Sequence, residues 1–194
     1  MNRFHRWYCR TGHWRHTIQD QVVPWVLRDV DLGDRVLEVG PGPGLTTDVV
    51  ARDVGSLIAV EIDADLASRL RDRFAATNVT VETGDATELP YADGTFSGAV
   101  SFTMLHHVPS AELQDRILRE VRRVLRPGGV FAGSDSRTST VFRLALMADT
   151  MVLVDPETIA ERLADAGFTD VNVQVAKGAF RFRATVPTDE STST

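Results

Sequence analysis

The chain has 194 residues, of which 43% are hydrophobic and 25% charged, as in ordinary globular domains. Its net charge of −6 argues against a general nucleic-acid-binding surface, and no apolar run approaches the roughly 20 residues of a membrane span. The single cysteine, Cys9, excludes an internal disulfide and a cysteine-based zinc site, so we expect no metal. The N-terminus has no signal-peptide pattern, and we therefore expect a cytoplasmic protein.

The first residues differ in character from the rest of the chain. No acid precedes Asp20, and the segment combines basic and aromatic side chains, namely Arg3, Arg6, Arg10 and Arg15 with Phe4, Trp7, Tyr8 and Trp14. We predict that residues 1–30 form a helical lid over the functional site. Its arginines would lie at the mouth of the acceptor pocket. The alternative is an ordinary helix at the sheet edge with a solvated basic face.

Strands and helices alternate after residue 33. Short apolar runs predict buried strands at residues 35–39, 57–60, 79–81, 96–102 and 130–134. The intervening helices are expected over residues 45–53, from a cap at Asp63, from a cap at Ser110, and from Asp155-Pro156 to Gly167. Residues 168–175 and 179–186 are joined by a short turn and should form an antiparallel hairpin.

This order predicts an α/β fold with a doubly wound, seven-stranded, mostly parallel, Rossmann-like sheet whose last strand is antiparallel. We expect a single domain over residues 1–187, with a cofactor-binding core at 33–135, an acceptor-side segment and hairpin at 136–187, and a disordered tail at 188–194. In such sheets the ligand lies beyond the carboxyl ends of the strands, beside the first strand.

The first strand runs into the segment Glu38-Val-Gly-Pro-Gly-Pro-Gly44. Glycines allow the backbone to approach a ligand closely. The spacing differs from the dinucleotide fingerprint that holds a pyrophosphate. An acid at position 38 would repel a pyrophosphate and would suit a cationic ammonium or sulfonium ligand. The alternative is a tight turn with a buried, hydrogen-bonded Glu38.

Acids also follow the second and third strands. Glu61 lies 17 residues after Gly44. This is close to the spacing at which an acid accepts hydrogen bonds from both hydroxyls of an adenosine ribose. Asp63 is the better helix cap, which leaves Glu61 for this role. Asp85, followed by Ala86, is placed to accept a hydrogen bond from an adenine amino group, although an Asp-initiated turn explains it equally well.

Four segments together resemble the successive motifs of class I S-adenosylmethionine-dependent methyltransferases, especially the small-molecule enzymes of the methyltransferase-domain-11 type: residues 38–44, 60–63, 84–90 and 123–129. The resemblance implies S-adenosyl-L-methionine as cofactor. It implies that Gly40, Gly42 and Gly44 surround the methionine part, that Glu38 orients its ammonium group, and that Glu61 holds the ribose. Asp85 with Ala86 would hold the adenine. Our cofactor-binding prediction also includes Ile62 and Phe102.

The fourth strand leads into residues 101–109, and the resemblance implies that this segment passes beneath the transferable methyl group. It lacks the Asn/Asp-Pro-Pro-aromatic sequence of enzymes that methylate planar amino groups. His106 and His107 are the candidate catalytic residues, because a hydroxyl, phenol or carbon-acid acceptor needs a base and a carboxylate does not. The alternative is that one caps the next helix or bonds to the backbone.

Residues 138–154 form an apolar stretch that is either core or part of an acceptor pocket. We predict methyl transfer to a small, hydrophobic, anionic acceptor such as a carboxylic acid or phenol, with no nucleic-acid partner. The competing functions are a nicotinamide-dependent oxidoreductase, a non-catalytic cofactor-binding protein and an aminopropyl transferase. The acceptor's identity and the oligomeric state stay open at this stage.

Overall fold

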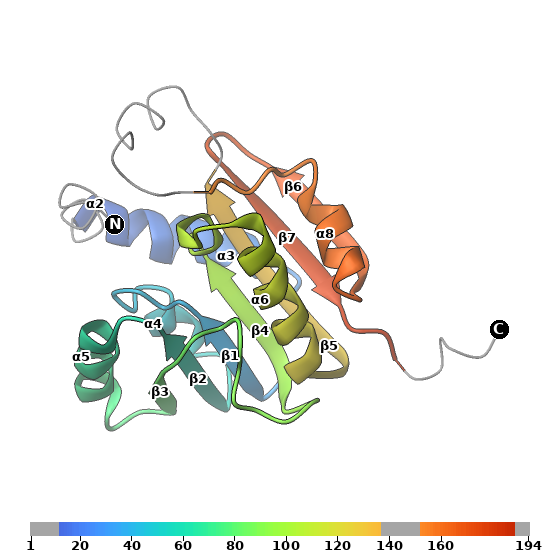
Figure 1. The fold of residues 1–194 in the computed structure, drawn as a ribbon. Coiled ribbons are helices and arrows are strands. Elements are labelled where there is room, and N and C mark those ends of the chain that lie inside the picture. Colours follow the sequence, from blue (N-terminus) through green and yellow to red (C-terminus); the bar gives the residue numbers. More distant parts are fainter. Residues whose placement is uncertain (1–11, 137–151, 189–194) are drawn as a thin grey trace.

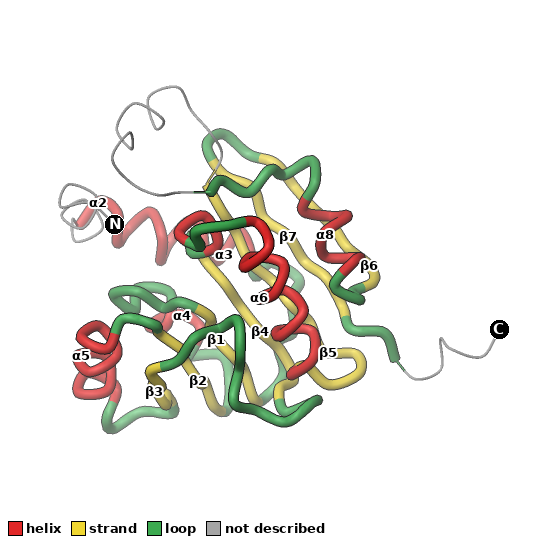
Figure 2. Tube along the Cα trace, in the orientation of Figure 1, coloured by secondary structure: helices red, strands yellow, loops and turns green. Residues whose placement is uncertain are grey.

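A computed structural model describes residues 12–136 and 152–188. In this part of the chain a 7-stranded sheet has the order β3-β2-β1-β4-β5-β7-β6, with helices on both faces (Figures 1 and 2). The strands are β1 Arg35–Val39, β2 Ser56–Glu61, β3 Val79–Thr83, β4 Phe96–Phe102, β5 Leu125–Ser136, β6 Thr169–Val175 and β7 Ala179–Thr185. Strands β1 to β5 are parallel, and β7 is antiparallel to both of its neighbours. The predicted fold class is confirmed.

The helices begin where short polar side chains satisfy their free amide groups. Asp63 accepts hydrogen bonds from two amides of α5, and Ser110 accepts one from Leu113 of α6. Both caps were predicted. The helical elements are α2 Gly12–His16, the π-helix η1 Thr17–Val22, α3 Val23–Val26, α4 Thr47–Val50, α5 Ala64–Phe74, the 3₁₀-helix η2 Leu105–His107, α6 Ala111–Val124 and α8 Ile159–Asp165.

Apolar side chains on alternate strand positions form a core on each face of the sheet. One face packs against α6 and α8, which lie in front of the sheet in Figure 1. Its core includes Leu37, Phe131, Phe180, Ile117 and Leu163. The other face packs against the N-terminal helices, α4 and α5, and its core includes Val36, Leu57, Ile18, Val26 and Leu70. Because the strands are packed on both faces, the positions at which the loops leave their carboxyl ends are fixed.

Three elements differ from their predicted bounds by three or more residues at one end. The helix expected at 45–53 is reduced to α4, and its flanking residues make i to i+3 hydrogen bonds of 3₁₀ type. The fifth strand begins at Leu125 because Leu125 already pairs with Phe96 of β4. The helix expected from Asp155 begins at Ile159, because residues 156–158 form a turn in which the amide of Thr158 donates to the carbonyl of Asp155, an i to i+3 bond.

The parallel register places the carboxyl ends of β1, β2, β3, β4 and β5 along one edge of the sheet. The predicted site residues follow those ends in the sequence, so the fold gathers them at that edge. In the described part of the chain, no helix is both long and apolar enough to cross a membrane.

Candidate active site

The loop after β1 turns at three glycines. Gly40, Gly42 and Gly44 have positive φ values of 67°, 54° and 77°, a region that glycine adopts without steric cost. A Cβ atom on Gly44 would lie 2.6 Å from Leu70 and 3.3 Å from Phe74 of α5. A Cβ atom on Gly42 would meet no atom within 4 Å. Packing therefore requires Gly44, whereas Gly42 borders open space at the carboxyl end of β1.

Glu38 lies on β1 just before this loop and is 1% exposed. The hydroxyls of Thr46 and Thr47 donate to its two carboxylate oxygens, the second over 2.7 Å. Burial raises the pKa of Glu38 to about 7, against the opposite effect of the two hydroxyl bonds, and the nearby charges of Asp48 and Glu61 raise it further. Glu38 thus fixes the start of α4 and titrates close to neutrality. Its predicted contact with an ammonium group stays a prediction.

Glu61, the last residue of β2, is 6% exposed and lies beside the glycine loop. Its Oε2 accepts the amide of Gly42 over 3.0 Å, and its Oε1 accepts the amide of Asp63 over 3.0 Å. The parallel pairing of β1 with β2 brings the acid and the loop together. Glu61 therefore lies next to the open space at Gly42, and its predicted ribose contact stays a prediction.

The loop after β3 continues this edge. Gly84 donates its amide to the carbonyl of Glu61 over 3.0 Å, which sets the following residues, Asp85 and Ala86, beside the end of β2. Asp85 is exposed and its Oδ1 accepts the amide of Thr87 over 2.8 Å, so the Asp-initiated turn is present. Ile62 is 70% exposed, which is unusual for a large apolar residue and fits an apolar contact with a ligand.

Two residues that the sequence did not single out hold the glycine loop from outside. Arg73 of α5 donates to the carbonyl of Pro43 over 2.9 Å and pairs with Asp48. Gln19 of η1 donates to the carbonyl of Leu45 and to Asp48, both over 3.1 Å. The signal for both was weak, because arginines and glutamines on helices usually face solvent.

The end of β4 is held in an uncommon conformation. Phe102 is 5% exposed and packs in the core under the N-terminal helices, so its predicted cofactor contact stays a prediction. Thr103 has a φ of 49°, which is rare for a β-branched residue, and its amide donates to Ser134 over 2.8 Å. Met104 lies directly against Gly40. Such strain occurs frequently at functional sites.

His106 forms a buried pair with Asp135. Its Nδ1 lies in hydrogen-bond contact with Asp135 Oδ1, and its backbone amide donates to Asp135 Oδ2 over 3.1 Å. The side chains are 2% and 1% exposed. Sequence reasoning named His106 and missed Asp135, although its place at the carboxyl end of β5 was a usable signal. A carboxylate on one ring nitrogen fixes the orientation and tautomer of an imidazole.

His107 is half-buried, and its ring lies 4.1 Å from that of His106 between centroids. Most of the predicted acceptor-side stretch 138–154 lies outside the described residues; of its described end, Val154 is buried and Val152 bonds to the carbonyl of His106 over 3.1 Å. Residues 1–11 of the predicted lid also lie outside the described part. In its described part, Ile18 and Val26 are buried against the sheet.

The assembled edge combines buried acids with a glycine loop and an oriented imidazole. Acids at the ends of β1 and β2 repel a pyrophosphate and attract a cationic ligand. Within residues 12–136 and 152–188, no group of three or more His, Cys, Asp or Glu side chains is placed to hold a metal ion. The sheet order with its antiparallel β7, together with this edge, defines the class I methyltransferase fold.

A sequence profile described as the methyltransferase domain matches residues 37–133, and the chain belongs to this family. The methyl donor of this family is S-adenosyl-L-methionine, and the chain carries its S-adenosylmethionine-dependent methyltransferase domain. The resemblance stated from the four motifs is thereby confirmed.

Curated relatives differ in what their names say they methylate. The chain is 30% identical over 167 residues to an arsenite methyltransferase of Halobacterium salinarum, covering 82% of this chain and 40% of the relative. It is 31% identical over 169 residues to the chloroplastic 2-methyl-6-phytyl-1,4-hydroquinone methyltransferase 2 of Oryza sativa, covering 84% and 47%. It is 32% identical over 161 residues to the ribosomal RNA small subunit methyltransferase A of Bordetella pertussis, covering 74% and 60%. The chain thus spans less than two thirds of each relative's length.

Solved structures share the fold at low sequence identity. A methyltransferase of Haloferax volcanii, solved with its activator protein, superposes with a TM-score of 0.72 at 17% identity, covering 95% of this chain and 96% of that one. A phosphoethanolamine N-methyltransferase of Haemonchus contortus, solved with its phosphorylated amine and S-adenosylhomocysteine, gives 0.71 at 16% identity, covering 91% and 57%. These likenesses establish the fold alone.

Proposed function

We propose that the protein methylates an oxygen atom of a small hydrophobic molecule, and that the acceptor is a phenol or other hydroxyl in preference to a carboxylate. The observation that carries this proposal is the buried His106–Asp135 pair at the carboxyl ends of β4 and β5. A carboxylate is ionised at neutral pH and needs no base, whereas a hydroxyl must lose its proton as it reacts. An imidazole held by a carboxylate supplies such a base.

The residues around the glycine loop fit the cofactor. The open space at Gly42 gives a ligand room beside the backbone, and the buried acids Glu38 and Glu61 suit its positive charges. S-adenosylmethionine supplies an electrophilic methyl group on a sulfonium centre. We assign Gly40, Gly42 and Gly44 to its methionine part, Glu38 to the ammonium group and Glu61 to the ribose hydroxyls.

The adenine end is assigned to the neighbouring loop. Asp85 and Ala86 would bind the edge of the ring, because Gly84 ties this loop to the end of β2. Ile62, exposed beside Glu61, would pack against the ring face. Phe102 would support the site from the core.

His106 would accept the acceptor's proton. When Nδ1 carries a proton and donates it to Asp135, Nε2 keeps the lone pair that a base needs. Removing the hydroxyl proton leaves an electron pair on oxygen for bond formation with the methyl carbon. Most of the remaining rate enhancement comes from alignment of the reactants and exclusion of water, because the sulfonium is already a good leaving group.

Charge and sequence favour a small molecule over a nucleic acid, although one set of relatives methylates ribosomal RNA by name. The chain carries a net charge of −6, and residues 101–109 lack the motif associated with planar amino groups. The hydroquinone named for another relative is a hydrophobic phenol. We therefore retain a small hydrophobic acceptor that becomes anionic as it reacts.

A paired acceptor panel tests the proposal. Alkylphenols and the matching alkylbenzoates are offered with labelled S-adenosylmethionine to the wild type and to His106→Ala. We expect methyl ethers from phenols, formed about 10²–10⁴-fold more slowly by the variant. Methyl esters as the main product, formed equally fast by both proteins, would overturn the hydroxyl assignment.

A further inference from the structure

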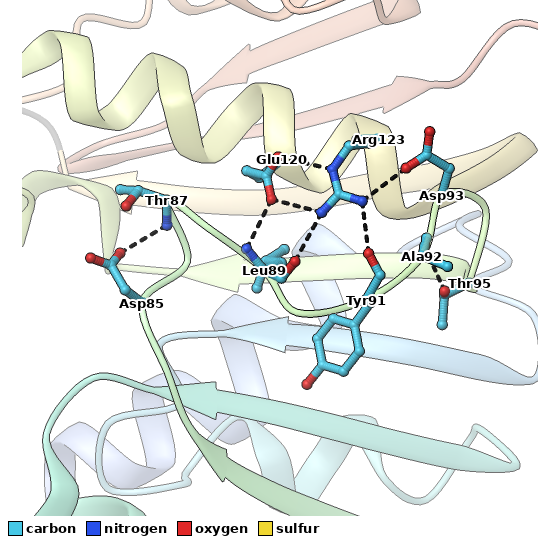
Figure 3. A network of polar contacts seen from close by, with 9 residues as sticks. All are labelled: Asp85, Thr87, Leu89, Tyr91, Ala92, Asp93, Thr95, Glu120 and Arg123. Carbon is cyan, nitrogen blue, oxygen red and sulfur yellow. Dashed lines mark hydrogen bonds and ion pairs between the residues drawn. The ribbon is translucent and has the colours of Figure 1, made fainter.

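Arg123, in the last turn of α6, bonds to the loop after β3 through both terminal nitrogens of its guanidinium group. Its Nη2 donates to the carbonyl of Leu89 over 2.9 Å, and its Nη1 donates to the carbonyl of Tyr91 over 2.7 Å and to Asp93 over 2.8 Å. Its Nε and Nη2 also bond to the two carboxylate oxygens of Glu120, over 2.9 and 2.8 Å. Figure 3 shows the guanidinium between α6 and this loop.

Glu120 completes the contact from the same helix. Its Oε2 accepts the amide of Leu89 over 2.8 Å, so the arginine and the glutamate together engage both backbone groups of this one residue. The hydrogen bonds from Arg123 lower the pKa of Glu120, which keeps the carboxylate charged. Leu89 itself is 4% exposed and sits in the core beneath α6. The Arg123–Glu120 pair therefore fixes the position of Leu89.

The segment between β3 and Leu89 is consequently held at both ends. At its start, Gly84 is hydrogen-bonded to the carbonyl of Glu61. Between these anchors lie Asp85 and Ala86, with Thr87 closing the turn onto the Asp85 side chain, as Figure 3 shows. So short a segment leaves Asp85 little freedom once Leu89 is fixed.

Tyr91 ties the same loop to β3 by a second contact. The Tyr91 hydroxyl donates to Glu82 of β3 over 2.7 Å, and its ring meets Phe96 edge-on with centroids 5.0 Å apart. The backbone beyond Leu89 is thus fixed by the core and by β3 as well as by Arg123. Loss of Arg123 should leave the fold in place and release chiefly the residues around position 89.

We propose that Arg123 and Glu120 are positioning residues that set the cofactor's adenine specificity by fixing the segment from Gly84 to Leu89. This proposal rests on the assignment of Asp85 and Ala86 to adenine made above. The pair lies on α6 and acts through the loop. Recognition groups must be held within about 0.5 Å of their productive position, so even a small drift of Asp85 weakens its discrimination.

Two homocysteine ligands test the proposal by calorimetry. S-adenosylhomocysteine carries the 6-amino group that Asp85 accepts, whereas S-inosylhomocysteine carries an oxygen there. The wild type should bind the adenosine ligand at least about tenfold more tightly, since tenfold corresponds to one ordinary hydrogen bond. In Arg123→Gln and Glu120→Gln the two ligands should bind with affinities that differ by no more than about twofold. Most of this change should come from weaker binding of S-adenosylhomocysteine.

Arg119→Gln is the matched control, because Arg119 is an exposed arginine of the same helix and its loss changes the net charge equally. It should keep the wild-type ratio. A purely structural role predicts that both ligands weaken equally in Arg123→Gln, or that only the melting temperature falls, and either result overturns the proposal. If Arg123→Gln does not fold, the more conservative Glu120→Gln decides by the same ratio. A wild type without discrimination would refute the adenine assignment itself and this proposal with it.

Discussion

Glu61 Oε2 accepts the amide hydrogen of Gly42 over 3.0 Å, so the acid at the end of β2 and the glycine loop after β1 form one unit. This bond joins two of the residues that the sequence assigns to cofactor binding. It also means that the loop conformation and the orientation of the acid are set together before any ligand binds. Preorganisation of this kind reduces the cost of ligand binding.

The first prediction concerns Glu61. Replacing it with Ala should weaken S-adenosylmethionine binding by about 1–3 kcal/mol, because charge-assisted hydrogen bonds are lost. Isothermal titration calorimetry measures the change. Glu157→Ala, which removes an exposed glutamate in the turn before α8, should leave the affinity unchanged. Equal affinity in Glu61→Ala and the wild type would remove Glu61 from the binding site.

The second prediction compares two glycines with the same backbone requirement. Gly42 and Gly178 have φ values of 54° and 88°, and a Cβ on either would meet no atom within 4 Å. Alanine should therefore cost each about 1–2 kcal/mol of folding stability. Only Gly42→Ala should weaken cofactor binding, by at least about tenfold, because its Cβ enters the space assigned to the ligand. The same affinity in both variants would contradict that assignment.

The third prediction follows from Glu38, whose pKa burial raises to about 7. The folded protein holds this proton more tightly than the unfolded chain, so the stability that it contributes is lost as the pH rises from about 4.5 to about 7. A bound ammonium group favours the ionised acid. Cofactor binding should therefore release a proton and tighten about tenfold between pH 6 and pH 8.

Calorimetry in buffers of different ionisation enthalpy counts the released protons at pH 6. Glu38→Gln removes the titrating group and keeps the size of the side chain. The cofactor affinity of this variant should not change between pH 6 and pH 8. A wild-type affinity that is flat with pH, with no proton released, would refute the pairing of Glu38 with a cation.

The fourth prediction concerns the pair His106 and Asp135. Asp135→Asn should lower turnover of a hydroxyl acceptor by about 10²–10⁴-fold, because the amide no longer stabilises the protonated imidazole or its tautomer. Cofactor affinity should change by less than about twofold, since neither residue is assigned to the cofactor. His107→Ala separates the two histidines. If it reproduces the loss and His106→Ala does not, His107 is the base.

The fifth prediction tests whether the N-terminal residues act as a lid over the acceptor. Deleting residues 1–11 should leave a folded protein that binds cofactor, because Ile18 and Gln19 keep their contacts with the sheet and the glycine loop. Methyl transfer should be slow, because part of the segment expected to cover the acceptor is missing. Changing Arg3, Arg6 and Arg10 to Gln should raise the acceptor's Michaelis constant. Lower thermal stability with an unchanged Michaelis constant would favour a plain structural helix.

Much of this architecture was predictable because the sequence repeats a simple pattern. Strand β1 and strand β4 have their predicted bounds. Strand β1 ends where Gly40 and Pro41 interrupt the run of strand-forming residues. Asp63 and Ser110 mark their helices by cap chemistry alone. The order of the motifs then predicts which strand ends meet, and the structure confirms the parallel neighbours.

What escaped prediction depends on contacts between distant segments. Asp135 binds His106 across 29 positions of sequence, and Arg123 reaches Leu89 across 34. Arg73 and Gln19 support the glycine loop in the same way. No local pattern records such partners, because they arise only when the sheet aligns the strand ends. Leu125 shows the converse. It follows Ile117 and Val121 at four-residue spacing, a pattern that predicts a helix, but it pairs with Phe96 of β4 instead.

The central claim is that this methyltransferase acts on the oxygen of a small hydrophobic hydroxyl compound. The most direct measurement incubates the protein with fractionated metabolite extract and deuteromethyl-labelled S-adenosylmethionine, and identifies labelled products by mass spectrometry. We expect one dominant small, apolar methyl ether that disappears with Asp135→Asn. Label found on RNA, on a cationic amine or on a carbon atom would contradict it.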